Sequence, residues 1–415
     1  MATQEYGSLR LGFIMTGSDV AYDSKGTGCN TFLVVFRPTS ERTPETPYHL
    51  GHVVVTGHDH DTWPYTLVVG TAEGAEDLLA EPVGYERVWT DEGTGGELYG
   101  ACWRPIPPAG YKALGYMFTQ SYDTPTDSRG LRCVREDYVQ ERAAIGDLLW
   151  DDHGGGGDYD LALYPVQAPK YDGEDAVLLI APGTFIGVGN YDKPDSDPGA
   201  NVLKVPAVEH DGSQAALPVM DSYGEPTQQT QPACDRSTLV PYTAVKDGAK
   251  DEQWKAENSP FYTVERWVSY SRILFLNNQS ELVQPVSDTV TTGVSKSDTD
   301  TFSASVGIMV GFETGVDFLG EEAKVMGSIT TTLGYESSHT TEFSYQESVE
   351  RTLNVAAQHA GAEYVASHEI RVMRADGTEV SGGSLSFDAS DSYVILQYPP
   401  AGPGEAPAVH SVTRN

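Results

Sequence analysis

The chain has 415 residues, and its 60 Asp and Glu against 26 Lys and Arg give a formal net charge of -34 at pH 7. Nucleic-acid phosphates would repel such a chain, and anionic lipid would not attract it by charge alone. No stretch reaches the about 20 apolar residues of a membrane helix, and the first apolar run is too short for a secretory signal. We therefore expect a soluble protein, released by a nonclassical route or present as a mature form, that binds no nucleic acid.

The composition predicts an all-β chain of two or three domains. Gly 43, Pro 25 and Tyr 23 accompany many short runs rich in Thr, Val and Tyr, with few stretches of helical period. No nucleophile elbow and no histidine pair on a helix face is present, so we expect no enzyme, no cofactor and no metal site. The four cysteines lack metal-ligand spacing and are compatible with two disulfides or with four buried thiols.

Residues 1–210 contain one motif three times, beginning at Val20, Val88 and Leu149. Aligned, the copies share an acidic residue, a glycine and an aromatic residue: Asp23, Asp91 and Asp152; Gly28, Gly95 and Gly156; Phe36, Trp103 and Tyr164. Three copies of a β-rich unit predict a threefold β-prism-like domain in which each copy gives one sheet. We expect the shared aromatic residues to point to a common axis and the glycine-rich turns to lie at one end.

Each copy ends in an acidic loop, and these loops are candidate ligand sites. Their candidate residues are Asp59, Asp61, Tyr122, Asp123, Tyr191 and Asp192. In one interpretation an aromatic ring stacks on a sugar while a carboxylate accepts hydroxyl hydrogen bonds. In the other, which we favour for any single loop, Asp stabilises a tight turn by bonding to its own backbone. A metal on the run from His58 to Asp61 is disfavoured because alternate residues of an extended run point to opposite sides.

The middle copy carries a family resemblance. The stretch WRPIPPAGYKALGYM, followed by RCVREDYV and LLWDDHGGGG, resembles the vacuolar-protein-sorting-related proteins of plants and fungi, and the likeness spans most of the first 200 residues. That name implies membrane trafficking as one possible role. Residues 211–258 are poor in strand patterns and rich in Gln, Pro and Gly, so we expect a linker or irregular wrap there.

The stretch from residue 301 to 335 alternates between larger apolar and small or polar side chains, and the parity of the apolar positions switches halfway. This pattern predicts a hairpin over 302–335 with its two-residue turn at Gly320 and Glu321. In that register Ile308 faces Leu333, and Asp317 lies across from Lys324. The alternative is an ordinary sandwich hairpin with one buried face.

Both strands of the predicted hairpin have the about 9–11 residues that a bilayer-crossing strand needs. The apolar face, expected to contact lipid, consists of Val306, Ile308, Val310, Phe312, Val316, Phe318, Val325, Ile329, Leu333 and Tyr335. The opposite face, expected to line a pore, carries Glu313, Asp317, Lys324 and Glu336.

The order of segments from Phe261 to Pro400 resembles the aerolysin-type β-pore-forming proteins, including the epsilon-toxin and mosquitocidal-toxin group. A Ser/Thr-rich strand, the amphipathic hairpin, a second Ser/Thr-rich strand and a return segment follow one another. The resemblance implies an elongated pore-forming module over 259–415 that reaches a target membrane through a glycan, lipid or protein receptor, forms a homo-oligomer and inserts the hairpin. The competing hypothesis is a glycan-binding, storage or defence protein whose C-terminal half is a static stalk.

Overall fold

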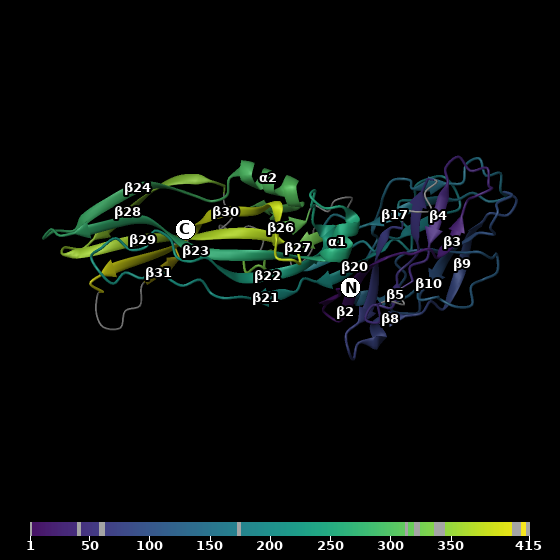
Figure 1. The fold of residues 1–415 in the computed structure, drawn as a ribbon, viewed down its shortest axis with the longest axis horizontal. Coiled ribbons are helices and arrows are strands. Elements are labelled where there is room, and N and C mark those ends of the chain that lie inside the picture. The colour runs from purple at the N-terminus through teal and green to yellow at the C-terminus, as the bar shows by residue number, and fades with distance from the viewer. Residues whose placement is uncertain are drawn as a thin grey trace.

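The computed structural model describes residues 2–39, 43–57, 63–171, 176–311, 314–318, 324–335, 345–400 and 408–411. The molecule is elongated, with the N-terminal half (purple to blue) at one end and the C-terminal half (green to yellow) at the other (Figure 1). Antiparallel sheets dominate both halves, which confirms the predicted all-β class. Among the described residues, no helix is long and apolar enough to cross a bilayer.

In the N-terminal half, each copy of the repeat forms one antiparallel sheet whose second strand is central, with three strands in the first two copies and four in the third. The first sheet contains β3 (Val20–Asp23), β4 (Leu33–Phe36) and β6 (Val53–Thr56). The second contains β9 (Gly84–Thr90), β10 (Ala101–Ile106) and β12 (Met117–Thr119). The third contains β16 (Trp150–Asp151), β17 (Ala162–Gln167) and β19 (Phe185–Val188), and β15 (Ala144–Ile145) pairs with β17 at its far end.

Three further sheets complete this half. One has the order β1 (Gln4–Tyr6), β2 (Leu9–Met15), β7 (Tyr65–Thr71) and β5 (Tyr48–His49). Another has the order β11 (Tyr111–Lys112), β13 (Cys133–Arg135) and β8 (Leu79–Ala80), with the short helices η1 (Glu76–Leu78) and η2 (Glu136–Tyr138) nearby. The last combines β14 (Val139–Glu141), β20 (Asn201–Pro206) and β18 (Val177–Ile180) with three strands from the C-terminal half, β27 (Val325–Ser328), β26 (Gly315–Phe318) and β25 (Ile308–Gly311).

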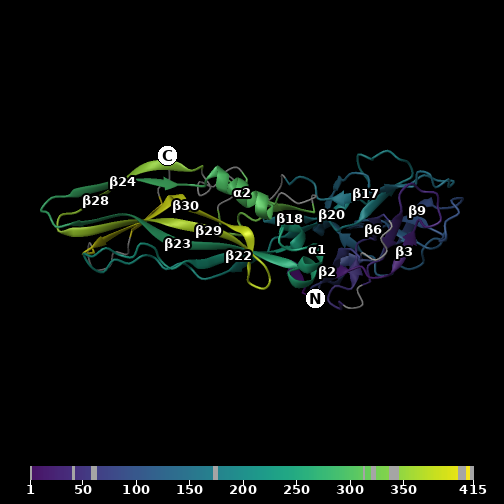
Figure 2. The same cartoon turned by 45° about the horizontal axis from the view of Figure 1, so that its top comes forward.

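The C-terminal half is built on one long sheet and a separate ribbon. The sheet has the order β21 (Glu209–Asp211), β22 (Ala233–Pro241), β23 (Phe261–Asn278), β29 (His359–Met373), β30 (Glu379–Tyr398) and β31 (Ala408–Ser411). The ribbon pairs β24 (Gln284–Thr292) with β28 (Glu347–Val355). The helices are η3 (Tyr242–Ala244), α1 (Glu252–Asn258) and α2 (Lys296–Val306), and α2 lies along β30 (Figure 2).

The prediction that residues 211–258 form an irregular wrap is wrong for its second part. That part contributes β22 to the long sheet and contains α1. A bulge between Cys234 and Arg236 interrupts the pairing of β22 with β23, which breaks the alternation that would have indicated a strand.

The two halves share an apolar core at their junction. Phe261 packs against Tyr6 and Phe13 with ring centroids 6.3 and 5.9 Å apart, and Phe13 meets the edge of Tyr242 at 4.7 Å. All four side chains are buried. The N- and C-terminal halves are therefore packed together by aromatic side chains from both.

The described residues of 302–335 do not form the predicted hairpin. Residues 302–306 are helical, and β25 turns back at once onto β26, so that Ile308 faces Phe318 and not Leu333. Asp317 pairs with Met309 on one side and with Ser328 on the other, and not with Lys324.

Two local features explain the difference. Phe302 and Val306 are even-numbered, as a strand requires, but they are also four apart, which places them on one helix face, and both are buried there. Glycines also interrupt the continuous strand that the alternating pattern predicts. Gly307 closes α2 with φ 74°, and Gly315 opens β26 with φ 68°, conformations that glycine adopts most readily.

Candidate functional site

Each copy of the repeat contains a tight turn closed by a buried acceptor. Asp91 and Asp152 each accept a hydrogen bond from the backbone N–H nine residues further along, at 2.8 and 3.0 Å. In the first copy Ser24 takes this place with a bond of 2.8 Å, and not Asp23, which is the residue aligned with Asp91 and Asp152. All three acceptors are at most 5% exposed. A hydroxyl can replace the carboxylate because either oxygen satisfies the same N–H.

The three turns are joined in a closed ring. Backbone hydrogen bonds of 2.8 to 3.0 Å run from the N–H of one turn to the carbonyl of the next: Glu97 to Lys25, Asp158 to Glu92 and Asn30 to His153. The indole Nε1 of Trp89 also donates to Asp152 of the neighbouring copy at 2.9 Å. The copies therefore hold one another through backbone and buried side chains.

The aromatic residues that meet inside this half are only in part those predicted. Trp89 lies at the centre, with its ring centroid 5.8 Å from Tyr22 and 6.5 Å from Trp150. Each of the three residues comes two positions before its turn acceptor. Of the predicted residues, Tyr164 belongs to the same core cluster as these three, whereas Trp103 belongs to a separate, smaller cluster. The prediction chose the later aromatic positions because they follow the glycines, and sequence spacing alone does not distinguish the two sets.

The predicted ligand residues of the second and third copies take part in these turns. The Tyr122 hydroxyl donates to Asp91 at 2.7 Å, and the Tyr191 hydroxyl donates to Asp152 at 3.0 Å. The backbone N–H groups of Asp123 and Asp192 donate to Ser121 and Asn190 in short turns. Asp59 and Asp61 lie outside the described residues. The tyrosines thus have internal partners, and the ligand role of these loops stays a prediction.

Replacing Asp152 by Asn tests whether the ring of turns stabilises the N-terminal half. The Nδ2 group of Asn would face donors that now meet a carboxylate, so we expect unfolding to become easier by about 2 kcal/mol. Chemical denaturation followed by Trp fluorescence measures the change. The exposed Asp123→Asn is the matched control and should change stability by less than about 0.5 kcal/mol. Equal effects of the two substitutions would contradict the role of the ring.

The C-terminal half holds a long segment between two paired strands. We call β24 and β28 the arms, and residues 293–346 between them the inter-arm segment. The arms pair without a bulge from Gln284 opposite Val355 to Thr292 opposite Glu347. Its described elements are α2 and β25 to β27, and these pack against the body of the protein (Figure 1).

The inter-arm segment is anchored first by the N-terminal half. Strand β27 pairs with β18 in full register, with Leu179 opposite Met326 and Ile180 opposite Val325. A further backbone bond of 2.8 Å runs from the N–H of Ala181 to the carbonyl of Lys324. One sheet therefore contains strands from both halves of the chain.

A second anchor lies on the long sheet. Arg266 of β23 donates to the Gly334 carbonyl at 2.7 Å, and its guanidinium lies 4.9 Å from the Tyr335 ring centroid. Asp235 fixes this guanidinium with two bonds of 2.9 and 2.6 Å. On the neighbouring strand, His368 packs 5.6 Å from the same tyrosine ring. We call Arg266, Gly334, Tyr335 and His368 the latch.

Two backbone bonds complete the anchoring. The N–H of Lys246 donates to the carbonyl of Val306, the last residue of α2, at 3.0 Å. Gly293, at the start of the inter-arm segment, donates to the Asp388 carbonyl of β30 at 2.8 Å. Both ends of α2 are therefore tied to the body.

The structure places nine of the ten predicted lipid-facing residues in the core. Each is at most 6% exposed: Val306, Ile308, Val310, Val316, Phe318, Val325, Ile329, Leu333 and Tyr335. Phe312, Glu313 and Glu336 lie outside the described residues. Of the predicted pore-lining residues, Asp317 and Lys324 are partly exposed. The sequence did not indicate Arg266 or His368, because a lone charged residue and a lone histidine within long strands carry no motif.

The latch should open at acidic pH. Burial, aided by the nearby Arg266 and opposed by Asp235, lowers the pKa of His368 from 6.5 to about 4. A lowered pKa means that the released state binds the proton more readily, so the stabilisation is complete above pH 6.5 and is lost as pH falls towards 4. At about pH 5 we expect the opening constant to rise by about 30-fold.

Hydrogen exchange of residues 329–335, corrected for the intrinsic rate, measures this opening. His368→Phe keeps a ring between Tyr335 and Phe387 and should remove most of the dependence between about pH 7 and about pH 5. His359→Phe, on the same strand and away from the latch, is the control. An unchanged pH dependence in His368→Phe would show that another group governs the opening.

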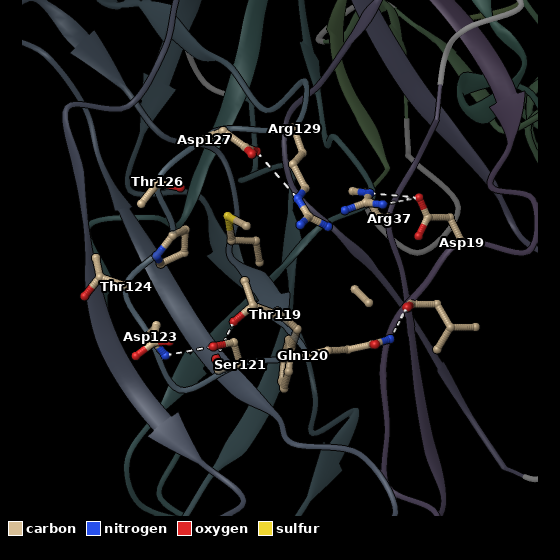
Figure 3. A pocket seen from close by; sticks show the side chains of 15 residues that line it. Asp19, Arg37, Thr119, Gln120, Ser121, Asp123, Thr124, Thr126, Asp127 and Arg129 are labelled. Atoms are coloured by element: carbon tan, nitrogen blue, oxygen red, sulfur yellow. Dashed lines mark hydrogen bonds and ion pairs between the residues drawn. The ribbon is translucent and has the colours of Figure 1, made fainter.

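The N-terminal half also contains a polar groove between its first two copies (Figure 3). We call it the Arg37–Arg129 groove. It has a volume of about 600 Å³ and adjoins a second hollow of about 440 Å³, and both are lined by Asp19, Arg37 and Arg129. Arg37 forms an ion pair with Asp19, and Arg129 lies 3.5 Å from Asp127. Among the described residues, no group of three or more side chains could hold a metal ion.

All four cysteines are free thiols. Burial raises the pKa of Cys133 to about 12, and burial with nearby Glu265 and Asp235 raises the pKa of Cys234 to about 11. Thiols with raised pKa values carry little thiolate at neutral pH and react slowly. The sequence left open two disulfides or four buried thiols, and the structure shows four thiols, of which Cys102 and Cys133 are buried and Cys29 and Cys234 are partly exposed.

Two solved structures are similar to this chain at low TM-scores. GNIP1Aa from Chromobacterium piscinae matches with a TM-score of 0.37 and 28% identity, over 44% of this chain and 34% of its own. The present chain thus spans about a third of the length of GNIP1Aa. Cry35Ab1 matches with a TM-score of 0.38 and 13% identity, over 95% of this chain and 91% of its own. At such TM-scores, neither structure bears on function.

No curated protein matches the chain. The model of the family described as vacuolar protein sorting-associated protein 62 matches residues 2–218, which hold the three repeat copies and β1 to β20. The match covers more than half of the sequence. The chain therefore belongs to the vacuolar protein sorting-associated protein 62 family.

Proposed function

We propose that this protein forms β-barrel pores, and that the inter-arm segment unfolds from the body to extend the two arms into a membrane-crossing hairpin. The register of the arms carries this proposal. Continued inward without a bulge, it would pair Val306 with Leu333 and Val310 with Ile329, and would place the turn at Leu319 and Gly320. The apolar pattern of the sequence places the turn one residue later, at Gly320 and Glu321. This shifts the pairing by two residues, so the arm register and the apolar pattern put the same side chains on one face.

The faces of the arms support the same continuation. On the side towards the body, Val290, Thr292, Leu353 and Val355 are buried. On the outer side, hydroxyls pair across the strands, Ser287 with Thr352 at 2.7 Å and Thr291 with Ser348 at 3.2 Å. Followed along the hairpin, the body side becomes the apolar face that would meet lipid. The hydroxyl side becomes the face of Glu313, Asp317, Lys324 and Glu336, which would line the pore.

The lengths are sufficient for a membrane-crossing barrel. Each arm would gain about 27 residues, or roughly 90 Å at about 3.4 Å per residue, against a hydrocarbon thickness of about 30 Å. Strands enter lipid only as a closed barrel, because every backbone group must be paired there. The protein would therefore act as a homo-oligomer on the target membrane, and Glu313, Asp317 and Glu336 would favour cations.

The energetics make release conditional on a membrane. Exposing the nine buried apolar side chains would cost on the order of 20 kcal/mol in water, a cost that burial in lipid offsets. Helix α2 offers little resistance of its own, because Ser, Thr and Asp fill most of its positions and these residues are weak helix formers. The anchors on β18 and in the latch would therefore control the release.

Dye release from vesicles tests the proposal. Vesicles of insect and of mammalian total lipid extract are treated at about pH 7 and about pH 5, with and without brief protease treatment, and each sample is run on a gel without boiling. We expect leakage together with a high-mass band. A chain that stays monomeric and releases no dye under all of these conditions is not a pore former. If it still binds glycan beads, the glycan-binding alternative is favoured.

The buried segment limits the choice of test variants. Arg at Val310 or Ile329 would block insertion, but these side chains are 6% and 0% exposed in the folded protein. An Arg there would also unfold the soluble form, so a loss of leakage would not distinguish the two effects. A disulfide between β18 and β27, which can be formed and reduced in the same folded protein, avoids this ambiguity.

A further inference from the structure

We propose that the Arg37–Arg129 groove binds a polyhydroxy ligand that carries one anionic group, as sugar acids and sugar phosphates do. Such a ligand would serve the receptor step of the proposed function, but its binding needs neither a membrane nor a pore. The groove lies between Asp19 and Arg37 of the first copy and the loop of residues 120–130 in the second.

The two arginines retain donors for an anion. Arg37 directs Nε and one terminal nitrogen to the same Asp19 oxygen, and its other terminal nitrogen has no partner among the described residues. Arg129 uses only Nε towards Asp127, and its side chain is 59% exposed. Their guanidinium groups point towards the same end of the groove (Figure 3). Each guanidinium has one carboxylate partner, Asp19 or Asp127, and keeps at least one terminal nitrogen that can donate to a carboxylate or phosphate oxygen of a ligand.

The position of Arg129 is held by its backbone. Its φ of 45° lies in the left-handed region, which is unfavourable for a residue with a Cβ. The ring nitrogen Nε2 of His49, which is 2% exposed, lies 3.3 Å from the Arg129 carbonyl. Such conformations persist where the surrounding structure fixes them, and they are concentrated at ligand sites.

The other wall of the groove suits hydroxyl groups. Ser121, Asp123, Thr124 and Thr126 present hydroxyls and a carboxylate. A carboxylate accepts hydrogen bonds from sugar hydroxyls and repels a second anionic group, so the ligand should be charged at one end only. The volume of about 600 Å³ is within the range of small-ligand sites and would admit one or two sugar rings.

Calorimetric titration of the full chain near physiological salt tests the site. The probes are sialyllactose, glucose 6-phosphate and lactose, which differ in the presence and the kind of the anionic group. We expect at least one anionic probe to bind at least about tenfold more tightly than lactose, and Arg129→Gln to weaken that binding by about tenfold or more. Arg129 is exposed, so this variant should stay folded. Arg87→Gln, an exposed arginine outside the groove, is the matched control.

The results of the titrations distinguish the classes of ligand and can overturn the proposal. Preference for sialyllactose identifies a sugar acid as the ligand, and preference for glucose 6-phosphate identifies a phosphate ester. Equal binding of lactose and the anionic probes, no binding of any probe, or binding that Arg129→Gln leaves unchanged overturns the proposal. Vesicle leakage without probe binding would reject only the groove, and probe binding without leakage would reject only the pore.

Discussion

An oxidised Leu179→Cys/Met326→Cys variant should release at least about a hundredfold less dye than the wild-type protein, and reduction should restore the release. The two residues lie opposite each other in β18 and β27. Antiparallel partners have Cα atoms about 4.5–5.5 Å apart, within the range that a disulfide spans. The bond would hold β27 in the sheet of the N-terminal half, so the inter-arm segment could not extend. Leakage is measured before and after reductant is added to the same variant, so that any difference comes from the disulfide and not from the substitutions.

The chain provides a closely matched control for this lock. Leu179 also lies opposite Lys204 of β20, on the other side of β18. A Leu179→Cys/Lys204→Cys disulfide would sit in the same sheet but leave β27 free to depart, so its leakage should be near that of the wild type. The four native cysteines are free, and single-cysteine variants show whether they form other disulfides. Full leakage from the oxidised β18–β27 lock would show that β27 need not leave the sheet.

Asp247→Asn should lower the free energy of unfolding by about 3–5 kcal/mol, because it leaves the Arg374 guanidinium buried without a carboxylate. Asp247 accepts from Arg374 at 2.7 and 3.0 Å and from the Tyr262 hydroxyl at 3.0 Å. The side chains of the ion pair are 0% and 8% exposed. The adjacent residue Lys246 holds the end of α2, so the substitution should also loosen the inter-arm segment.

The effect of Asp247 should depend on pH. Burial alone would raise the pKa of this carboxyl, but the bonds from Arg374 and Tyr262 outweigh it and hold the pKa below its ordinary value of 3.8. The stabilisation is therefore present above pH 3.8 and is lost as pH falls through the lower folded value. Denaturant titrations of the wild type and Asp247→Asn should differ most near neutral pH and converge in acid.

A surface pair gives the comparison for this prediction. Lys25 and Glu97 lie 2.9 Å apart, but both side chains are about 60% exposed. Glu97→Gln should change stability by less than about 1 kcal/mol, because water solvates either charge when its partner is removed. Similar losses for Glu97→Gln and Asp247→Asn would mean that burial is not what makes the Asp247 pair important.

The sequence predicts the repeated sheets better than it predicts which residues form hydrogen bonds with one another. The three motif copies each form one antiparallel sheet, because the repeated spacing of similar residues gives each copy the same order of strands. Aligning the copies does not give the turn acceptor of the first copy, where Ser24 takes the place of Asp91 and Asp152. Asp23, one residue earlier, matches the aspartates of the other two copies in the alignment, but its side chain does not close the turn.

Alternation of apolar residues shows which side chains share a face, but it does not show which strand pairs with which. Val325 and Met326 alternate as a strand should, and they do form β27. Their partner, β18, lies far away in the sequence and has no feature that predicts this pairing. Phe302 and Val306 satisfy helix and strand spacing equally. Such a segment adopts the form that its neighbours allow, which the sequence of the segment alone does not specify.

The strand β18 has β20 on one side and β27 on the other. Cleavage of the chain after residue 218, where the family match ends, would remove β27 and leave the backbone groups of residues 177–180 without their partners on that side. An open strand edge of this kind recruits strands from other molecules. In this structure the part of the chain that the family model matches is completed by a strand from the C-terminal half, and on its own it should pair that edge with another copy of itself.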